Sequence, residues 1–408
     1  MGYSVVIANR KFSALLVGQV ISLFGDVILT TALSWFVFAL AGTATAISYL
    51  SIAILVPNIF CSLVAGVVVD RSNRRRIMMT SDITRCLALI LIPIMYRLGG
   101  LTLIFLYLIV FVWSSASAFF LPARSAIIPQ IFPDKSQLTS ANSLINSFFE
   151  ATRLIGYGIS GIFIILFTAV GAASFDSITF AISALAILSM GSIASPLRQM
   201  RQKRNTLSEF REDLTEGLNY VWKNFVIRIV LLTAMIGNFF IGIGYGFIVV
   251  YARQALHTNA VGYGLLLAAS TIGTVTGSLP VGKVGFRKHL GMTLILSSIM
   301  MGIAIVSLSL QTQLAAAIPF MVLFGLGIAI YNVNYVNMFQ ATVPNEILGR
   351  VMSLDQVISY SIVPLSLAVG GPIVDLIGIR AAYLISGGMV ALIGVVTFIP
   401  KEYRKFSY

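Results

Sequence analysis

The ionisable residues inside long apolar stretches of this sequence, where charged side chains are costly, include Asp26, Glu150, Arg153 and Asp176. Such residues face a protein interior and are candidates for function by default. If the stretch after Lys11 is helical, Asp26 lies about 22 Å along it, at roughly 1.5 Å per residue. Burial favours the protonated form of a carboxyl group, so Asp26 is a candidate for binding a proton or a cationic substrate. A hydrogen-bonded structural aspartate is the alternative.

Glu150 and Arg153 are three residues apart, so on a helix they share a face and neutralise each other. A structural ion pair is the simpler interpretation of this spacing, and a role beside Asp26 in moving protons is the other. Asp176 lies near the predicted end of an apolar stretch, where solvation is cheap, and is expected to be structural.

The elements that carry these residues are predicted to be membrane-spanning helices. Hydrophobic residues make up 58% of the chain and charged residues only 10%, against roughly a quarter in soluble domains. Crossing a bilayer takes about 20 apolar residues per helix. The runs 47–69 and 290–310 are continuously apolar and lack the alternation of a barrel strand. We therefore expect an all-α membrane protein.

The apolar runs between charged, Gly or Pro residues predict twelve spans. They cover residues 12–40, 46–69, 77–97, 101–123, 138–169, 172–195, 225–251, 261–282, 290–310, 313–342, 353–377 and 380–399. Numbering the loops alternately leaves only Arg97, Arg253 and Arg380 on the side opposite the other basic loop residues. Because positively charged loops face the cytoplasm, we expect a multi-pass protein of the plasma membrane with both termini inside.

The net charge of +13 is explained by these loops and by attraction to anionic lipid. A nucleic-acid binder would gather its basic residues in a soluble domain. The two cysteines and two histidines lack metal-ligand spacing, so no metal or other cofactor is expected. Segment 277–284 fits a phosphate-binding loop only in part, because Val284 stands where a hydroxyl residue would bind magnesium. Since no hydrolase motif is found either, we do not expect an enzyme.

Two pairs of segments match at a nearly constant offset, which indicates an internal repeat. Residues 66–76 correspond to 278–288 at an offset of 212, and Pro133 corresponds to Pro344 at an offset of 211. Chance similarity between basic loops is the alternative.

The repeat predicts a six-helix half at 1–195, a linker at 196–224 and a second six-helix half at 225–408, an arrangement found in membrane proteins built from parallel repeats. In the linker, apolar residues recur every three or four positions, which predicts an interfacial helix. These residues are Leu207, Phe210, Leu214, Leu218 and Val221.

The segment Gly66-Val-Val-Val-Asp-Arg-Ser-Asn-Arg-Arg-Arg76 resembles the signature loop of the major facilitator superfamily, G-x-x-x-D-R-x-x-R-R-R/K, which lies between the second and third spans. Other segments resemble the branch that holds macrolide-efflux proteins and the enterobactin exporter: Gly25-Asp26, 141–144, 150–153 and 348–351. The resemblance covers nearly the whole chain and implies the major facilitator fold.

The signature loop is also a candidate conformational switch, since its charges could make contacts in one access state only. The residues concerned are Gly66, Asp70, Arg71, Arg74 and Arg75. We expect the arginines to engage lipid phosphates or carboxylates, and Gly66 to permit close helix approach. In the second copy Gly282 replaces the acidic residue, so a charge switch is confined to the first half. A basic loop that only sets topology is the alternative.

In that family the central cavity is lined chiefly by the first, fourth, seventh and tenth spans, and here each of them carries polar or aromatic side chains. An aromatic cavity with a few donors and acceptors suits a bulky amphipathic solute. The candidate substrate-binding residues are Asp26, Trp113, Ser117, Asn238, Phe239, Tyr331 and Asn334. Contacts between packed helices are the alternative for each.

The residues and the resemblance together predict a secondary active transporter, namely a proton-coupled exporter (antiporter) of amphipathic small molecules or drugs that works by alternating access. A dedicated exporter of a metabolite, siderophore or lipid is one alternative, and a non-transporting membrane receptor or scaffold is another. The expected partners are a small-molecule substrate, protons and a bilayer with anionic lipid, without nucleic acid. The chain is expected to act as a monomer.

Overall fold

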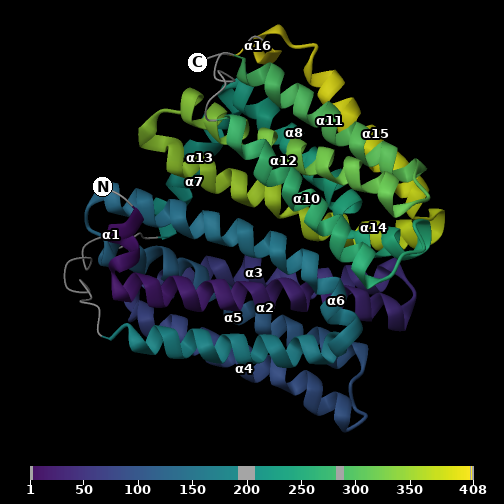
Figure 1. The fold of residues 1–408 in the computed structure, drawn as a ribbon. Helices are drawn as coiled ribbons and strands as arrows, with labels where there is room; N and C mark the ends of the chain where they lie inside the picture. The colour runs from purple at the N-terminus through teal and green to yellow at the C-terminus, as the bar shows by residue number, and fades with distance from the viewer. Residues whose placement is uncertain (1–2, 192–206, 282–288, 405, 407–408) are drawn as a thin grey trace. The chain divides into compact units, whose positions relative to one another are not determined.

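The computed structural model describes residues 3–191, 207–281, 289–404 and 406. These residues form helices joined by short turns (Figure 1). Eleven of the described helices are long and apolar enough to cross a membrane, and each predicted span overlaps one of them over most of its length. The chain divides into two compact units.

Unit 1 comprises Met1–Gly42 and Tyr49–Lys203. Its helices are α1 (Tyr3–Ala8), α2 (Arg10–Ala41), α3 (Ala44–Arg71) from Tyr49 onward, α4 (Arg74–Arg97), α5 (Leu103–Ile131) and α6 (Lys135–Ser189), drawn from purple to teal in Figure 1. Helix α6 packs against α2 and α4, and α4 packs against α5. These three packed pairs position the charged side chains described below.

Helix α6 is the reason that eleven long helices are found where twelve spans are predicted. It runs for 55 residues, which at about 1.5 Å per residue is far longer than the roughly 30 Å core of a bilayer. Within it, Thr168 has a non-helical backbone with φ 60° and ψ 179°. This break falls between the predicted spans 138–169 and 172–195, so the count of twelve requires α6 to cross the membrane twice.

Unit 2 comprises Thr43–Ser48 and Arg204–Tyr408. Its helices are α7 (Leu207–Lys223), α8 (Phe225–Gly246), α9 (Ile248–Val250), α10 (Ala260–Val281), α11 (Leu290–Leu310), α12 (Leu314–Thr342), α13 (Asn345–Asp355), α14 (Ile362–Ile377), α15 (Ile379–Thr397) and α16 (Lys401–Arg404). Two π-helical segments interrupt this series, η1 (Tyr251–Ala255) and η3 (Gln356–Tyr360). The main packed pairs are α10 with α12, α11 with α12 and α15, and α8 with α14 and α15.

The linker is helical in its second part, where α7 packs against α13 and α8. Val221 is buried in the core of unit 2, and the Tyr220 hydroxyl donates a hydrogen bond of 2.7 Å to the carbonyl oxygen of Thr342. Glu216 forms an ion pair with Arg350 of α13. Leu218 and Trp222 remain 39% and 64% exposed, so α7 has one face on the protein and one available to a membrane surface. The basic residues that open the linker, and the 282–288 part of the second signature copy, lie outside the described residues.

Candidate functional site

Four charged side chains gather in the interior of unit 1: Asp26 on α2, Asp82 and Arg85 on α4, and Asp176 on α6. Asp82 and Asp176 are fully buried, and Arg85 is 5% exposed. Asp82 and Arg85 form an ion pair one helical turn apart. Electrostatic interactions join Asp26 and Asp176 to each other and to this pair. We call these four residues the charged cluster.

Aromatic rings from two further helices hold the only cation of the charged cluster. The Arg85 guanidinium carbon lies 4.4 Å from the ring centre of Phe120 on α5 and 4.2 Å from that of Phe180 on α6. A cation over an aromatic face is attracted by the ring quadrupole, more strongly when it is desolvated. Arg85 is therefore fixed by packing as well as by its ion pair.

A glycine beside Asp26 allows Asp176 to approach. The Thr179 hydroxyl donates a hydrogen bond of 2.8 Å to Asp176 Oδ1. A Cβ atom at Gly25 would overlap that carboxylate and would lie 2.6 Å from Thr179 Oγ1. The pair Gly25-Asp26 thus combines a close contact between α2 and α6 with an ionisable group next to it. The expectation that Asp176 is cheaply solvated is wrong, because its side chain is fully buried.

The charged cluster has more acidic groups than basic ones. Asp26 Oδ1, Asp176 Oδ2 and Arg85 Nε are buried without a hydrogen-bond partner among the described residues. If all three carboxyl groups were ionised, one guanidinium would leave two negative charges uncompensated. Uncompensated buried charge is costly, and proton uptake is the usual way to remove it. The arrangement is therefore chemically suited to taking up and releasing protons.

Glu150 and Arg153 lie outside the charged cluster. They form the ion pair expected from their spacing, at 2.9 Å, and their side chains are 38% and 47% exposed. An exposed pair on one helix neutralises itself with little effect on stability.

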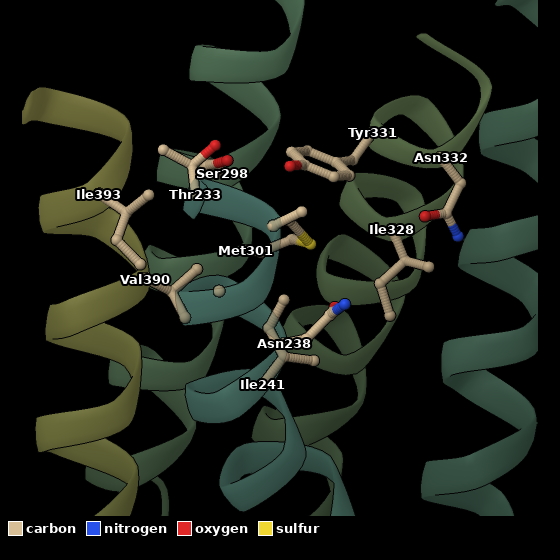
Figure 2. Close-up of a pocket in the computed structure, with 12 residues that line it drawn as sticks. Thr233, Asn238, Ile241, Ser298, Met301, Ile328, Tyr331, Asn332, Val390 and Ile393 are labelled. Carbon is tan, nitrogen blue, oxygen red and sulfur yellow. The ribbon is translucent and has the colours of Figure 1, made fainter. Parts of the chain in front are cut away.

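Unit 2 contains a cavity of about 140 Å³ lined by α8, α11, α12 and α15. Figure 2 shows side chains from these helices around one space. Its polar lining consists of Thr233, Asn238, Ser298, Tyr331 and Asn332, and the rest is apolar, as at Ile241, Met301 and Val390. None of the residues that line it is charged at neutral pH. The cavity therefore fits an uncharged group that has both apolar surface and hydrogen-bonding atoms.

Two of the predicted substrate-binding residues, Asn238 and Tyr331, line this cavity, and the others lie elsewhere. Asn334 is fully buried and donates a hydrogen bond of 2.7 Å to the carbonyl oxygen of Ile330. Phe239 lies edge-on to Phe240, with ring centres 5.3 Å apart.

Asp26, Trp113 and Ser117 belong to unit 1. Trp113 is 6% exposed, and the Ser117 hydroxyl donates a hydrogen bond of 3.0 Å to its carbonyl oxygen. The Ser117 hydroxyl is thus engaged within α5, whereas the Trp113 indole N–H is buried without a hydrogen-bond partner among the described residues.

The sequence carried signals for residues that the prediction did not name. Asp82 and Arg85 are charged residues three apart inside the predicted span 77–97, the same signal that identified Glu150 and Arg153. Asn332 directly follows Tyr331, but the prediction followed the face of the helix that carries Asn334. Thr233 and Ser298 have no signal of their own, because hydroxyl residues are common in such helices.

The signature loop makes its contacts inside unit 1. Arg74 donates a hydrogen bond of 3.0 Å to the carbonyl oxygen of Ala126, and Arg75 donates bonds of 2.9 Å and 2.5 Å to those of Ile187 and Leu188. These last two carbonyls belong to the final turn of α6, where they also accept long backbone bonds of 3.3 Å from Met190 and 3.5 Å from Gly191. Lipid phosphates and carboxylates were the expected partners, and backbone carbonyls are the ones observed.

Gly66, Asp70 and Arg71 are exposed, and no described atom lies within 4 Å of a Cβ built on Gly66. The close helix approach expected at Gly66 is therefore not seen within the described residues.

The chain matches known proteins over nearly its whole length. Residues 5–406 match the model of a family described as transmembrane secretion effectors. The chain is 25% identical to the multidrug efflux pump Tap of Mycolicibacterium fortuitum, over 96% of this chain and 94% of that protein. It is 23% identical to macrolide efflux protein A of Streptococcus pyogenes, over 97% of both.

Solved structures show the same fold. The nucleoside transporter NupG matches with a TM-score of 0.76 and 13% identity, over 96% of this chain and all of the other. A bacterial homologue of the iron transporter ferroportin, in an inward-facing state, matches with a TM-score of 0.76 and 14% identity, over 95% and 98%. The chain belongs to the transmembrane secretion effector family of the major facilitator superfamily, and is a multi-span membrane transporter rather than an enzyme.

Proposed function

We propose that this transporter is a proton-coupled exporter of amphipathic small molecules, including drugs, which works by alternating access in the plasma membrane with both termini in the cytoplasm. The observation that carries the proposal is the charged cluster, in which three carboxyl groups, two of them fully buried, share one guanidinium. Such a cluster needs protons to balance its charge, and an inward proton gradient supplies them.

Outward direction is supported by the relatives, two of which are named as efflux pumps. An uncharged cavity in unit 2 is consistent with amphipathic solutes. The proposal thus assigns proton binding to unit 1, with Asp26, Asp82 and Asp176 as the carboxyl groups, and solute contacts to residues that include Asn238 and Tyr331.

The test is transport by the purified chain in liposomes, with erythromycin as the macrolide probe. We expect a pH gradient that is acidic on the side opposite to the drug to accelerate its flux, and drug addition to dissipate the gradient. Asp26→Asn should abolish the gradient-dependent part, while Glu150→Gln, from the exposed pair, should retain most of it. Equal flux with and without the gradient would contradict proton coupling.

A dedicated exporter of a compact solute is the second candidate, because about 140 Å³ is small beside the 300–1,000 Å³ typical of drug-sized ligands. Flux of one compact neutral solute, such as a nucleoside, that other compounds fail to inhibit would favour it.

A further inference from the structure

A second buried carboxyl group, outside the charged cluster, lies in unit 2. Asp355 ends α13 at the start of the π-helix η3, and its side chain is 3% exposed. Its Oδ1 accepts hydrogen bonds from the Tyr335 hydroxyl at 2.5 Å and from the Ser359 hydroxyl at 2.6 Å. Among the described residues, no Lys, Arg or His forms an ion pair with it.

This geometry suits both the ionised and the protonated acid. Both hydroxyl donors use Oδ1, so a proton on Oδ2 leaves the two hydrogen bonds intact. Without a cation beside it, a buried carboxylate is costly, and protonation removes that cost. Release breaks the O–H bond on Oδ2 and passes the proton to water.

Two contacts connect Asp355 to the cavity through one intermediate residue each. The ring of Tyr331, which lines the cavity, stacks on that of Tyr335, with centres 5.7 Å apart and planes 23° apart. Asn238, which also lines the cavity (Figure 2), donates a hydrogen bond of 2.7 Å from its amide to the carbonyl oxygen of Ser359. That carbonyl belongs to η3, and single π-helical turns inside α-helices are frequent at functional sites.

The other charged groups on the elements around Asp355 form no ion pair with it among the described residues. Arg350 of α13 is paired with Glu216 of α7. The Arg228 guanidinium of α8 lies 5.8 Å from the ring of Trp222. Glu346 lies in the first turn of α13, and Asp375 of α14 accepts hydrogen bonds from the backbone of Ala44 and Thr45. The groups that face Asp355 are therefore the tyrosines, with Tyr335 in direct contact and Tyr331 behind it.

We propose that Asp355 is a proton-binding site and that occupation of the cavity changes its affinity for the proton. Solute that contacts Asn238 or Tyr331 shifts the Ser359 carbonyl or the Tyr335 ring, and with them the surroundings of the carboxyl group. Because linkage is reciprocal, the proton also changes the affinity for solute. Proton binding and solute binding weaken each other if the chain is an antiporter. Only this sign of the coupling rests on the proposed function.

The experiment is infrared spectroscopy of the full chain in lipid nanodiscs during a pH titration. A protonated carboxylic acid has its own C=O stretching band, and Asp355→Asn should remove one titrating band. Asn238→Ala should shift the midpoint of that band by about one pH unit, a tenfold change in proton affinity. Asn332→Ala is the matched control, because it lines the same cavity outside this chain of contacts, and should leave the midpoint in place.

An unchanged set of bands in Asp355→Asn, or equal shifts in Asn238→Ala and Asn332→Ala, would overturn the inference. If Asp355→Asn does not fold, Tyr335→Phe keeps the carboxyl group but removes one hydrogen bond, and must shift the same band. The readout needs no transport. If erythromycin drives no proton flux but Asp355 still titrates as expected, only the proposed function is contradicted. If erythromycin drives proton flux but Asp355 does not titrate as expected, only this inference is contradicted.

Discussion

Asp82 and Arg85 form an ion pair on one face of α4 that is almost completely removed from solvent, with exposed fractions of 0% and 5%. A buried pair of this kind stabilises little by itself, because desolvation offsets the attraction. The pair is important for the charged cluster because it contains Arg85. Arg85 is the cation that allows any of the three carboxyl groups to be ionised in the interior of unit 1.

Removal of Arg85 should therefore destabilise the protein. Breaking a buried pair by removing one partner costs about 3–5 kcal/mol, because the other charge is left uncompensated. We expect Arg85→Leu to lower the free energy of unfolding by an amount of this order in nanodiscs, and Arg153→Leu, from the exposed pair, to change it by about 1 kcal/mol or less. Asp82→Asn combined with Arg85→Leu should recover part of the loss. Similar losses in the two single variants would contradict the burial argument.

Gly25 offers a test of the close contact between α2 and α6. A Cβ atom there would overlap the Asp176 carboxylate, so Gly25→Ala must push α6 away or displace that side chain. Overpacking of this kind costs about 1–3 kcal/mol. Gly158→Ala is the control, since no atom lies within 4 Å of its Cβ position, and it should be neutral or slightly stabilising in a helix. Thermal unfolding of both variants, with infrared titration of the carboxyl bands, measures the difference.

The helices were predictable because hydropathy is a property of runs of residues, and each run is long enough to average over exceptions. The residues of α6 were predicted as two separate spans, yet the break in the helix at Thr168 carries no sequence signal, since threonine has no preference for a positive φ.

Side-chain neighbours were harder to predict. Asp26 was found because it stands alone in an apolar run, but its partners come from α4 and α6, and only tertiary packing brings them together. Tyr331 and Asn238 were placed near a cavity from the family pattern, whereas Asn334, one turn from Tyr331, points into packed helix instead. The rotation of a helix about its own axis decides which of its side chains line the cavity, and hydropathy does not determine that rotation.

Substitutions at Gly237 test whether solute binds in the cavity of unit 2. It lines the cavity from α8, and no atom lies within 4 Å of its Cβ position, so a side chain there fills empty space. We expect Gly237→Leu to weaken or abolish erythromycin-induced thermal stabilisation, Gly237→Ala to weaken it less, and neither to lower the melting temperature without ligand. Gly388→Leu, at an exposed and equally open site on α15, should bind normally. Unimpaired stabilisation in Gly237→Leu would place the solute elsewhere.

Substitutions at Arg75 and Asp70 distinguish a structural role of the signature loop from a role as a conformational switch. Arg75 donates hydrogen bonds to two carbonyls at the end of α6, and charge-assisted bonds of this kind contribute about 1.5–3 kcal/mol. Arg75→Ala should therefore lower the melting temperature, whereas the exposed Arg76→Ala should not.

Asp70 is exposed in unit 1, so Asp70→Asn should leave stability unchanged. If Asp70 belongs to a switch between access states, the same variant should slow erythromycin flux several-fold at unchanged binding. Normal flux in Asp70→Asn would reduce the loop to a determinant of topology and of the packing of α6.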